Sequence, residues 1–166
     1  MTVDSYKWLP PSMKAYFGNM EVPAPDDVPW TPLRRPLAEA RIALVTTAGI
    51  NVRGVEPPFD YEREQEHPGW GDATFRTVPR TLTQEQVQTG HLHINNEDIA
   101  GDVNVALPVH RMLELEAQGV IGALADENYS FMGYQPDTTE WTERYAPEVA
   151  GRMLAAGVDG VLLTPV

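Results

Sequence analysis

Cysteine is missing from all 166 residues of the chain. The chain therefore forms no disulfide and no thiolate metal site, and it has no thiol chemistry within these residues. Long apolar runs are also missing, since no stretch approaches the roughly 20 residues of a membrane-spanning helix. Basic residues are few, 12 against 24 acidic ones, which gives a net charge of −12. Because an acidic surface does not attract nucleic acid or anionic membranes, neither is an expected partner.

The first residues show neither the basic region nor the apolar region of a secretion signal, and we expect a cytoplasmic protein. Seven prolines among residues 1–40 forbid a long helix or a central strand there. We expect this segment to be a proline-rich extended N-terminal arm that packs on the core or on a neighbouring molecule. Residues 41–166 then form a single domain. The apolar anchors of the arm are Trp8, Tyr16, Phe17, Trp30 and Leu33.

Residues 41–46 are a nearly continuous apolar run, which predicts a strand covered on both faces, as in a parallel sheet. The run ends in Thr46, Thr47 and Gly49. Two hydroxyls and closely approachable backbone amides suit an anion or a carboxylate. A tight strand exit that merely needs a glycine explains the same residues equally well.

Residues 51–89 are polar and proline-containing, with no helical period. We expect a long loop packed by its own aromatic side chains, with a short strand near residues 75–78. The charged cluster at residues 62–66 is interpreted as a solvated face.

Residues 91–95 alternate between polar and apolar, which as a strand would place His91 and His93 on one face. The two imidazoles could share a metal if Asp98 or Asp102 supplied a third ligand. They could equally orient a substrate, shuttle a proton, or be plain strand histidines bonded to the loop backbone. Since two candidate nitrogens are few for a metal site, we expect no metal and no other cofactor.

Two helices are predicted in the second half of the chain. The first starts at Pro108, covers residues 108–118 and ends at Gly119. The second covers residues 138–156, is capped by Asp137, and either kinks at Pro147 or restarts there. Apolar stripes face the sheet from both helices. Their members are Val109, Met112 and Leu113 in the first and Trp141, Tyr145, Val149 and Met153 in the second.

An apolar, β-branched run closes the chain after Gly157 and predicts a buried strand over residues 158–164. A helix, a glycine and a buried strand form the second half of a βαβ unit, so the expected fold is α/β, a Rossmann-like parallel sheet layered with helices. Ligands of such sheets lie beyond the carboxyl ends of the strands, here near Thr164. Ser130 also follows a predicted strand, but it lacks the Gly-x-Ser-x-Gly pattern of a nucleophile.

Six segments occur in an order that resembles the selenoprotein B family of glycine, sarcosine, betaine and D-proline reductases, especially its shorter stand-alone members. They are residues 28–33, 43–50, 58–60, 91–95, 129–134 and 157–166. In that family, the segment matching residues 162–166 is followed directly by selenocysteine or cysteine. The resemblance implies that these residues are the N-terminal portion of a reductase and stop just before its nucleophile, through a misread UGA codon or a deliberate truncation.

The resemblance also implies the reaction, which is reductive cleavage of C–N or related bonds with a disulfide as acceptor. The implied partners are a small-molecule substrate, a redox partner protein and further copies of the chain. Two other interpretations stay open: a complete non-catalytic subunit or small-ligand binding protein, and a metal-dependent hydrolase that uses the two histidines. The implied substrate pocket consists of Thr46, Thr47, Gly49, His91, His93, Ser130, Tyr134 and Thr164.

Overall fold

The computed structural model describes residues 7–19 and 31–166. The chain divides into two units, Met1–Pro32 and Leu33–Val166. The described part of the first unit contains the helix α1 (Pro11–Gly18). Of the anchors predicted for the arm, Trp30 lies outside the described residues, as do the side chains of Tyr16 and Phe17. In the described ranges, every helix is too short or too polar to cross a membrane.

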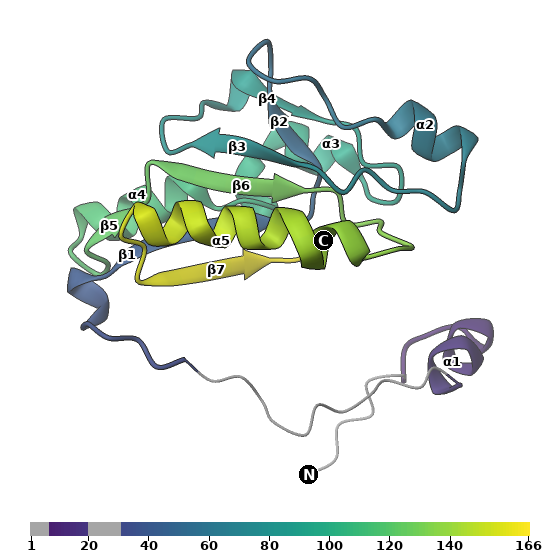
Figure 1. Cartoon of the computed structure of the whole chain (residues 1–166), viewed down its shortest axis with the longest axis horizontal. Coiled ribbons are helices and arrows are strands. Elements are labelled where there is room, and N and C mark those ends of the chain that lie inside the picture. Colours follow the sequence, from purple (N-terminus) through teal and green to yellow (C-terminus); the bar gives the residue numbers. More distant parts are fainter. Residues whose placement is uncertain (1–6, 20–30) are drawn as a thin grey trace. The chain divides into compact units, whose positions relative to one another are not determined.

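The second unit is a mixed α/β structure (Figure 1). Its strands are β1 (Arg41–Thr46), β2 (Ile50–Val52), β3 (Phe75–Pro79), β4 (Val87–Thr89), β5 (Ala123–Leu124), β6 (Glu127–Phe131) and β7 (Gly160–Thr164). Its α-helices are α2 (Tyr61–Glu66), α3 (Asn96–Gly101), α4 (Val109–Ala117) and α5 (Ala146–Ala155). Short helical turns are η1 (Leu37–Glu39), η2 (Gln84–Gln86), η3 (Val103–Val105) and η4 (Trp141–Tyr145).

Five strands form one sheet with β1 at its centre. β5 and β6 follow one another along one side of β1, β7 lies along the other side, and all three run parallel to β1. β3 pairs with β6 and runs antiparallel to it. The predicted α/β class and the parallel pairing of β1 with β7 are confirmed. The all-parallel sheet is wrong, because β3 adds an antiparallel strand.

Successive side chains of β1 supply the cores on both faces of the sheet. Leu44 belongs to a buried cluster that includes Met112 of α4. Ala43 belongs to a second cluster that includes Val149 and Met153 of α5. The two predicted helices therefore cover opposite faces of the sheet, and α5 lies in front of it in Figure 1. This alternation is the period of two that a strand covered on both faces requires.

The side chain of Asn128 fills a break between β5 and β6. Arg41 pairs with Ala123, but Val45 pairs with Tyr129, so two extra residues bulge from the β5–β6 side. The Oδ1 atom of Asn128 accepts a hydrogen bond of 2.9 Å from the amide of Leu44. A buried side chain thus replaces the backbone acceptor that the bulge removes.

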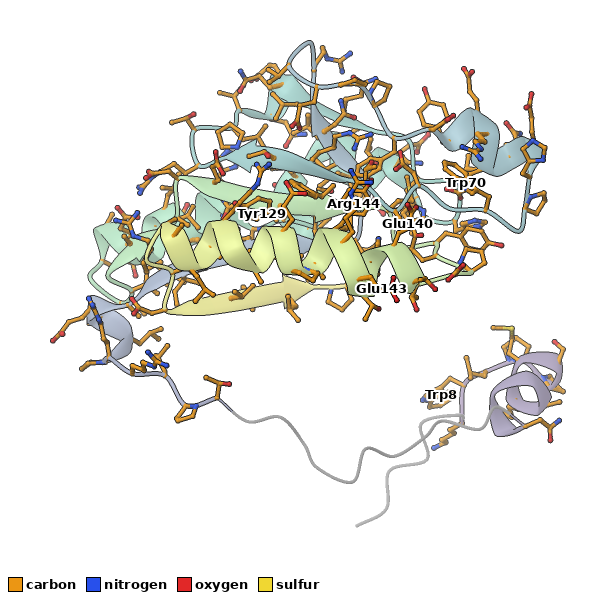
Figure 2. The ribbon with its side chains drawn as sticks, viewed as in Figure 1. Trp8, Trp70, Tyr129, Glu140, Glu143 and Arg144 are labelled. Atoms are coloured by element: carbon orange, nitrogen blue, oxygen red, sulfur yellow. The ribbon has the colours of Figure 1, made fainter. Side chains whose placement is uncertain are left out.

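The helix that ends in α5 begins with a widened turn. Asp137 accepts hydrogen bonds from the amide and the hydroxyl of Thr139, which confirms the predicted cap. The π-helical turn η4 then leads into α5, where Pro147 lies in the first turn. The chain stays helical from η4 into α5, and Pro147, which has no N–H group to donate, directly follows the widened turn. Tyr129 of β6, labelled in Figure 2, belongs to the same core cluster as Val149 and Met153 of this helix.

The strand predicted over residues 158–164 is not buried. Val161, Leu162 and Leu163 of β7 are 44, 41 and 66% exposed. Among the described strands β7 pairs with β1 alone, so it forms an edge of the sheet. Apolar composition predicts a covered strand, but whether a strand lies at an edge depends on its neighbours.

Residues 51–89 contain more structure than the predicted loop. β2 and β4 pair antiparallel in a small second sheet. Asp60 caps α2, since its side chain accepts a hydrogen bond from the amide of Arg63. A helix of six residues is too short to show a period, which explains why the sequence did not predict it. The predicted strand near residues 75–78 is confirmed as β3.

Candidate functional site

Threonine hydroxyls join the carboxyl ends of β1 and β7. The Oγ1 atom of Thr46 donates a hydrogen bond of 3.0 Å to the carbonyl oxygen of Thr164. The Oγ1 atom of Thr164 lies 3.2 Å from the carbonyl oxygen of Val45 and 2.7 Å from that of Ala106. Both predicted site residues lie at the strand ends as expected, but their hydroxyls are bonded within the protein. They fix the strand ends in place.

Thr47 holds Val166 beside the exit of β1. Its Oγ1 atom accepts a hydrogen bond of 2.9 Å from the amide of Val166 and lies 3.4 Å from the carbonyl oxygen of the same residue. A single side chain therefore contacts both backbone polar groups of Val166. This fixes the position of the backbone two residues beyond β7.

Two glycines allow backbone segments to approach one another closely near Thr47 and Val166. Gly49 has a φ of +64°, a conformation that side chains with a Cβ rarely adopt. A Cβ on Gly133 would lie 3.0 Å from the carbonyl oxygen of Thr47, 3.2 Å from Nε2 of His91 and 3.2 Å from the carbonyl oxygen of Val166. The strand exit, the histidine and Val166 thus meet around Gly133.

His91 is buried, and one of its two ring nitrogens has no hydrogen-bond partner in the described residues. Only 3% of the residue is exposed. Its Nδ1 atom accepts a hydrogen bond of 3.1 Å from the backbone amide of His93. Within residues 7–19 and 31–166, Nε2 of His91 has no hydrogen-bond partner. Burial, and to a lesser degree the neighbouring His93, lowers the pKa of His91. The neutral imidazole is therefore favoured, with its proton on Nε2, because Nδ1 acts as an acceptor.

Residues 91–95 do not form the predicted strand. His91 leads into a turn, and the Asn95 side chain caps α3 by accepting a hydrogen bond from the amide of Glu97. Such local side-chain to backbone bonds compete with strand pairing, which explains the error. The two imidazoles are still neighbours, with ring centroids 5.8 Å apart.

A buried carboxylate lies behind the histidines. Oε1 of Glu64 is 3.2 Å from Nε2 of His93, close enough for an ion pair. Neither oxygen of Glu64 has an aligned hydrogen-bond partner in the part of the chain that the structure describes. Burial raises the pKa of Glu64, Asp72 raises it further, and His93 opposes the shift. The prediction of a wholly solvated acidic cluster is wrong at Glu64, which is 3% exposed.

Tyr134 completes this second group of side chains. Its ring centroid lies 4.5 Å from that of His93, and its hydroxyl donates a hydrogen bond to the carbonyl oxygen of Pro68. Glu64, Pro68, His93 and Tyr134 are among the residues lining a hollow of about 320 Å³. The structure therefore places both histidines, Tyr134 and Glu64 close together.

Ser130 is placed differently from the other predicted residues. It is fully buried in β6, and its Oγ atom accepts a hydrogen bond of 2.8 Å from the amide of Ile50. This bond links the main sheet to the start of β2. The geometry gives the hydroxyl a structural partner, and Ser130 is not among the residues that line the hollow at His93.

The aspartates considered as third metal ligands lie elsewhere. Asp98 and Asp102 line a separate hollow of about 550 Å³, whose wall also includes Val166. Asp102 caps η3 through the amide of Asn104. In the described ranges, no three histidine, aspartate or glutamate side chains are grouped to hold a metal ion. In this arrangement neither aspartate joins the two histidines as a third ligand.

Comparison with known proteins identifies the class. The family model described as glycine/sarcosine/betaine reductase selenoprotein B matches residues 12–166. The chain belongs to this family, as the resemblance of its sequence segments indicated. No solved structure is significantly similar to it.

Several curated relatives are subunits of reductases. The chain is 32% identical to the D-proline reductase subunit gamma of Acetoanaerobium sticklandii over 152 residues, 92% of this chain and 59% of the relative. It is 32% identical to the glycine reductase complex component B subunit gamma of Symbiobacterium thermophilum over 151 residues, 90% of this chain and 34% of the relative. For the betaine reductase complex component B subunit beta of Peptoclostridium acidaminophilum, the identity is 29% over 145 residues, 87% of this chain and 32% of the relative. The chain thus spans about a third to three fifths of these relatives.

Glu64 is the functional candidate that the sequence did not reveal. It lies between exposed neighbours in the charged cluster at residues 62–66, so composition alone favours a solvated face. The one available signal was the capping aspartate Asp60, which starts α2 and fixes which side chain turns inward.

Proposed function

We propose that this chain forms part of a selenol- or thiol-dependent reductase, and that it supplies the pocket in which the nucleophile works. The family membership supports a reductase role. The reaction needs a selenol or a thiol, and these 166 residues contain no cysteine. The nucleophile of this proposal is a selenocysteine or cysteine directly after Val166, where the family resemblance indicates it.

The proposed chemistry is reductive cleavage of a C–N or related bond. A selenolate attacks the carbon, a C–Se bond forms, and the C–N bond breaks as the amine leaves with the electron pair and takes up a proton. A thiolate then attacks selenium, and the carbon departs with the C–Se electron pair and a proton. The substrate gains two electrons, and the selenol–thiol pair is oxidised to a selenenylsulfide, or to a disulfide where cysteine replaces selenocysteine. A redox partner protein with a dithiol restores the reduced pair.

The observation that carries this proposal is the position of Val166. Thr47 fixes its amide and carbonyl, and both its carbonyl oxygen and Nε2 of His91 lie close to Gly133. Catalytic groups of α/β sheets are held beyond the carboxyl ends of parallel strands, which is where β1 and β7 deliver this backbone. A nucleophile attached there would be held by a rigid sheet and would face a buried imidazole.

A cysteine added after Val166 tests the proposal directly. Since the chain has no other cysteine, all thiol reactivity in this variant comes from the added residue. We expect its thiol to have a pKa below the ordinary value of about 8.5 and to be alkylated quickly near neutral pH. A cysteine added after Thr2, near the start of the chain, is the matched control and should react slowly. An ordinary thiol after Val166, or reductase activity of the cysteine-free chain, would overturn the proposal.

The coding sequence gives a second, independent test. An in-frame UGA after the Val166 codon, followed by codons for Pro-x-Cys-His, is the result expected of a selenoprotein. A UAA or UAG codon there would favour the alternative of a non-catalytic subunit or a small-ligand binding protein.

We also propose that the exposed edge of β7 pairs with another polypeptide. Three successive apolar side chains, at residues 161–163, are exposed there. A Rossmann-like sheet that continued past β7 would cover this edge, and a second copy of the chain could do the same. Pairing with a second copy of the chain is the version of this proposal that can be tested with the purified chain alone.

A further inference from the structure

His91 has a buried hydrogen-bond donor without an acceptor in the described residues. Its Nε2 atom is buried and, as far as residues 7–19 and 31–166 extend, unbonded. A buried N–H group without an acceptor costs free energy, because it has lost its bond to water. The site therefore fits an additional acceptor close to Gly133, Thr47 and Val166.

The backbone of His93 decides which ring nitrogen carries the proton. Its amide donates to Nδ1 of His91 at 3.1 Å, so Nδ1 must be the acceptor and the proton of the neutral ring must be on Nε2. An amide does not change its proton with pH, so the assignment holds for as long as the ring is neutral. The ring then acts as a neutral donor. It is not a general acid, since loss of the Nε2 proton would leave an imidazolate.

We propose that the Nε2–H group of His91 donates a hydrogen bond to the selenolate or thiolate that follows Val166 and stabilises its ionised form. This inference rests on the proposed function, because it assigns a role towards the same nucleophile. A neutral donor suits a step in which the nucleophile must be ionised yet remain reactive. It lowers the pKa of the nucleophile without a competing positive charge.

The surroundings of His91 keep it neutral. Burial is the main factor that disfavours a positive charge on His91, and the neighbouring His93 ring, with its centroid 5.8 Å away, adds to it. Glu64 pairs with His93, since its Oε1 atom lies 3.2 Å from Nε2 of that ring. The carbonyl oxygens of Thr47 and Val166 and Nε2 of His91 all lie close to Gly133, which adds no side chain. Nε2–H is therefore the polar hydrogen of the neutral ring that is left to bond to the proposed nucleophile.

Nitrogen NMR of the unaltered 166-residue chain, labelled at histidine, tests the tautomer. We expect the His91 ring to stay neutral well below pH 6.5, about the ordinary pKa of histidine, with the proton on Nε2. A ring that carries its proton on Nδ1, or that titrates at the ordinary pKa, would overturn the inference without bearing on the proposed function.

The chain with cysteine after Val166 tests the contact itself. His91→Phe keeps a planar ring but removes the donor, and should raise the thiol pKa by about one to two units, since a hydrogen bond to a charged group contributes roughly that much. His91→Gln retains an N–H donor and should restore part of the shift. His67→Phe changes an exposed histidine and should leave the thiol pKa as it is. Thermal unfolding of each variant identifies any that fails to fold, and in that case the tautomer measurement decides.

The outcomes separate the two proposals. A low thiol pKa that His91→Phe leaves unchanged would overturn the role of His91 and leave the proposed function standing. An ordinary thiol pKa with His91 intact would overturn both. A low pKa that rises in His91→Phe and partly recovers in His91→Gln supports both.

Discussion

Nε2 of His93 lies 3.2 Å from Oε1 of a glutamate, Glu64, whose side chain is 1% exposed. The two residues differ in environment, since the side chain of His93 is 51% exposed. The carboxylate is therefore shielded from solvent, whereas about half of the side chain of its partner is accessible. Such an arrangement makes the stability of α2 and of the histidine turn depend on pH.

Glu64→Gln should stabilise the protein at neutral and alkaline pH. Burial raises the folded-state pKa of Glu64, so the folded chain binds its proton more tightly than the unfolded chain does. The stability that protonated Glu64 contributes is fully present below the pKa of this group in the unfolded chain. It is lost as pH rises through the pKa of Glu64 in the folded chain. Glutamine is neutral throughout, so the unfolding temperature of the variant should increasingly exceed that of the parent from about pH 4 upwards, by about 2–4 °C for each kcal/mol. Thermal unfolding across this range measures the difference.

Glu66→Gln is the matched control, because Glu66 is exposed on the same helix. It should show little dependence on pH. If Glu64→Gln were less stable than the parent at pH 8, the pair with His93 would outweigh the burial of the carboxylate, contrary to this prediction.

Asn128→Asp should destabilise the sheet at neutral pH. The substituted side chain still accepts from the amide of Leu44, but a carboxylate would replace the donor that faces the carbonyl oxygens of Val78 and Ala125. An unpaired buried charge costs about 3–5 kcal/mol, so the unfolding temperature should fall by about 10 °C. Acidification should restore part of the loss, because the protonated carboxyl can donate again.

Asn95→Asp is the control for this substitution. Asn95 is exposed and caps α3, where aspartate is an equally good cap, and the substitution loses only an exposed hydrogen bond to Asp98. Its unfolding temperature should stay close to that of the parent. An Asn128→Asp variant as stable as this control would show that the bond to Leu44 is the only one that matters in the bulge.

The elements that the sequence predicted well are those with long, regular patterns. The apolar run of β1 and the apolar stripe that ends at Met153 are both regular patterns. As predicted, β1 is covered on both faces and the stripe packs against the sheet. The parallel partner of β1 followed from the βαβ pattern. The exposure of Leu163 did not, because an edge strand and a central strand can have the same composition.

The candidate site was only partly predictable for a related reason. Thr46 and Thr164 lie at strand ends, which the sequence locates, but the direction of a hydroxyl depends on carbonyl groups distant in the chain, such as that of Ala106. The turn after His91 depends on the cap of α3 and on the amide of His93. These contacts lie within a few residues of one another and have no period, so alternation of polar and apolar residues suggested a strand instead.

Gly133→Ala should disturb the site more than the rest of the protein. The new methyl group would lie 3.0 Å from the carbonyl oxygen of Thr47 and 3.2 Å from Nε2 of His91, closer than ordinary contacts. We expect a loss of about 1–2 kcal/mol, typical of mild overpacking, together with a shift of the His91 ring signals in NMR spectra. Gly151→Ala is the control, since the described residues leave space around Gly151 in α5. It should gain about 1 kcal/mol from helix propensity. Unchanged ring signals in Gly133→Ala would contradict the close packing of His91 and Gly133.

Leu163→Lys should abolish the proposed self-association through β7. Leu163 is 66% exposed on β7, and its neighbours Val161 and Leu162 add to an apolar edge whose backbone is available for pairing. Two copies related by a twofold axis would pair their β7 edges antiparallel, and a lysine on this edge would place like charges opposite one another. Leu154→Lys is the matched control, because Leu154 is 76% exposed but lies on α5, where there is no strand edge. Analytical ultracentrifugation should show a dimer for the parent and for Leu154→Lys, and a monomer for Leu163→Lys. A monomeric parent, or a dimer that Leu163→Lys leaves intact, would show that the β7 edge does not pair with a second copy.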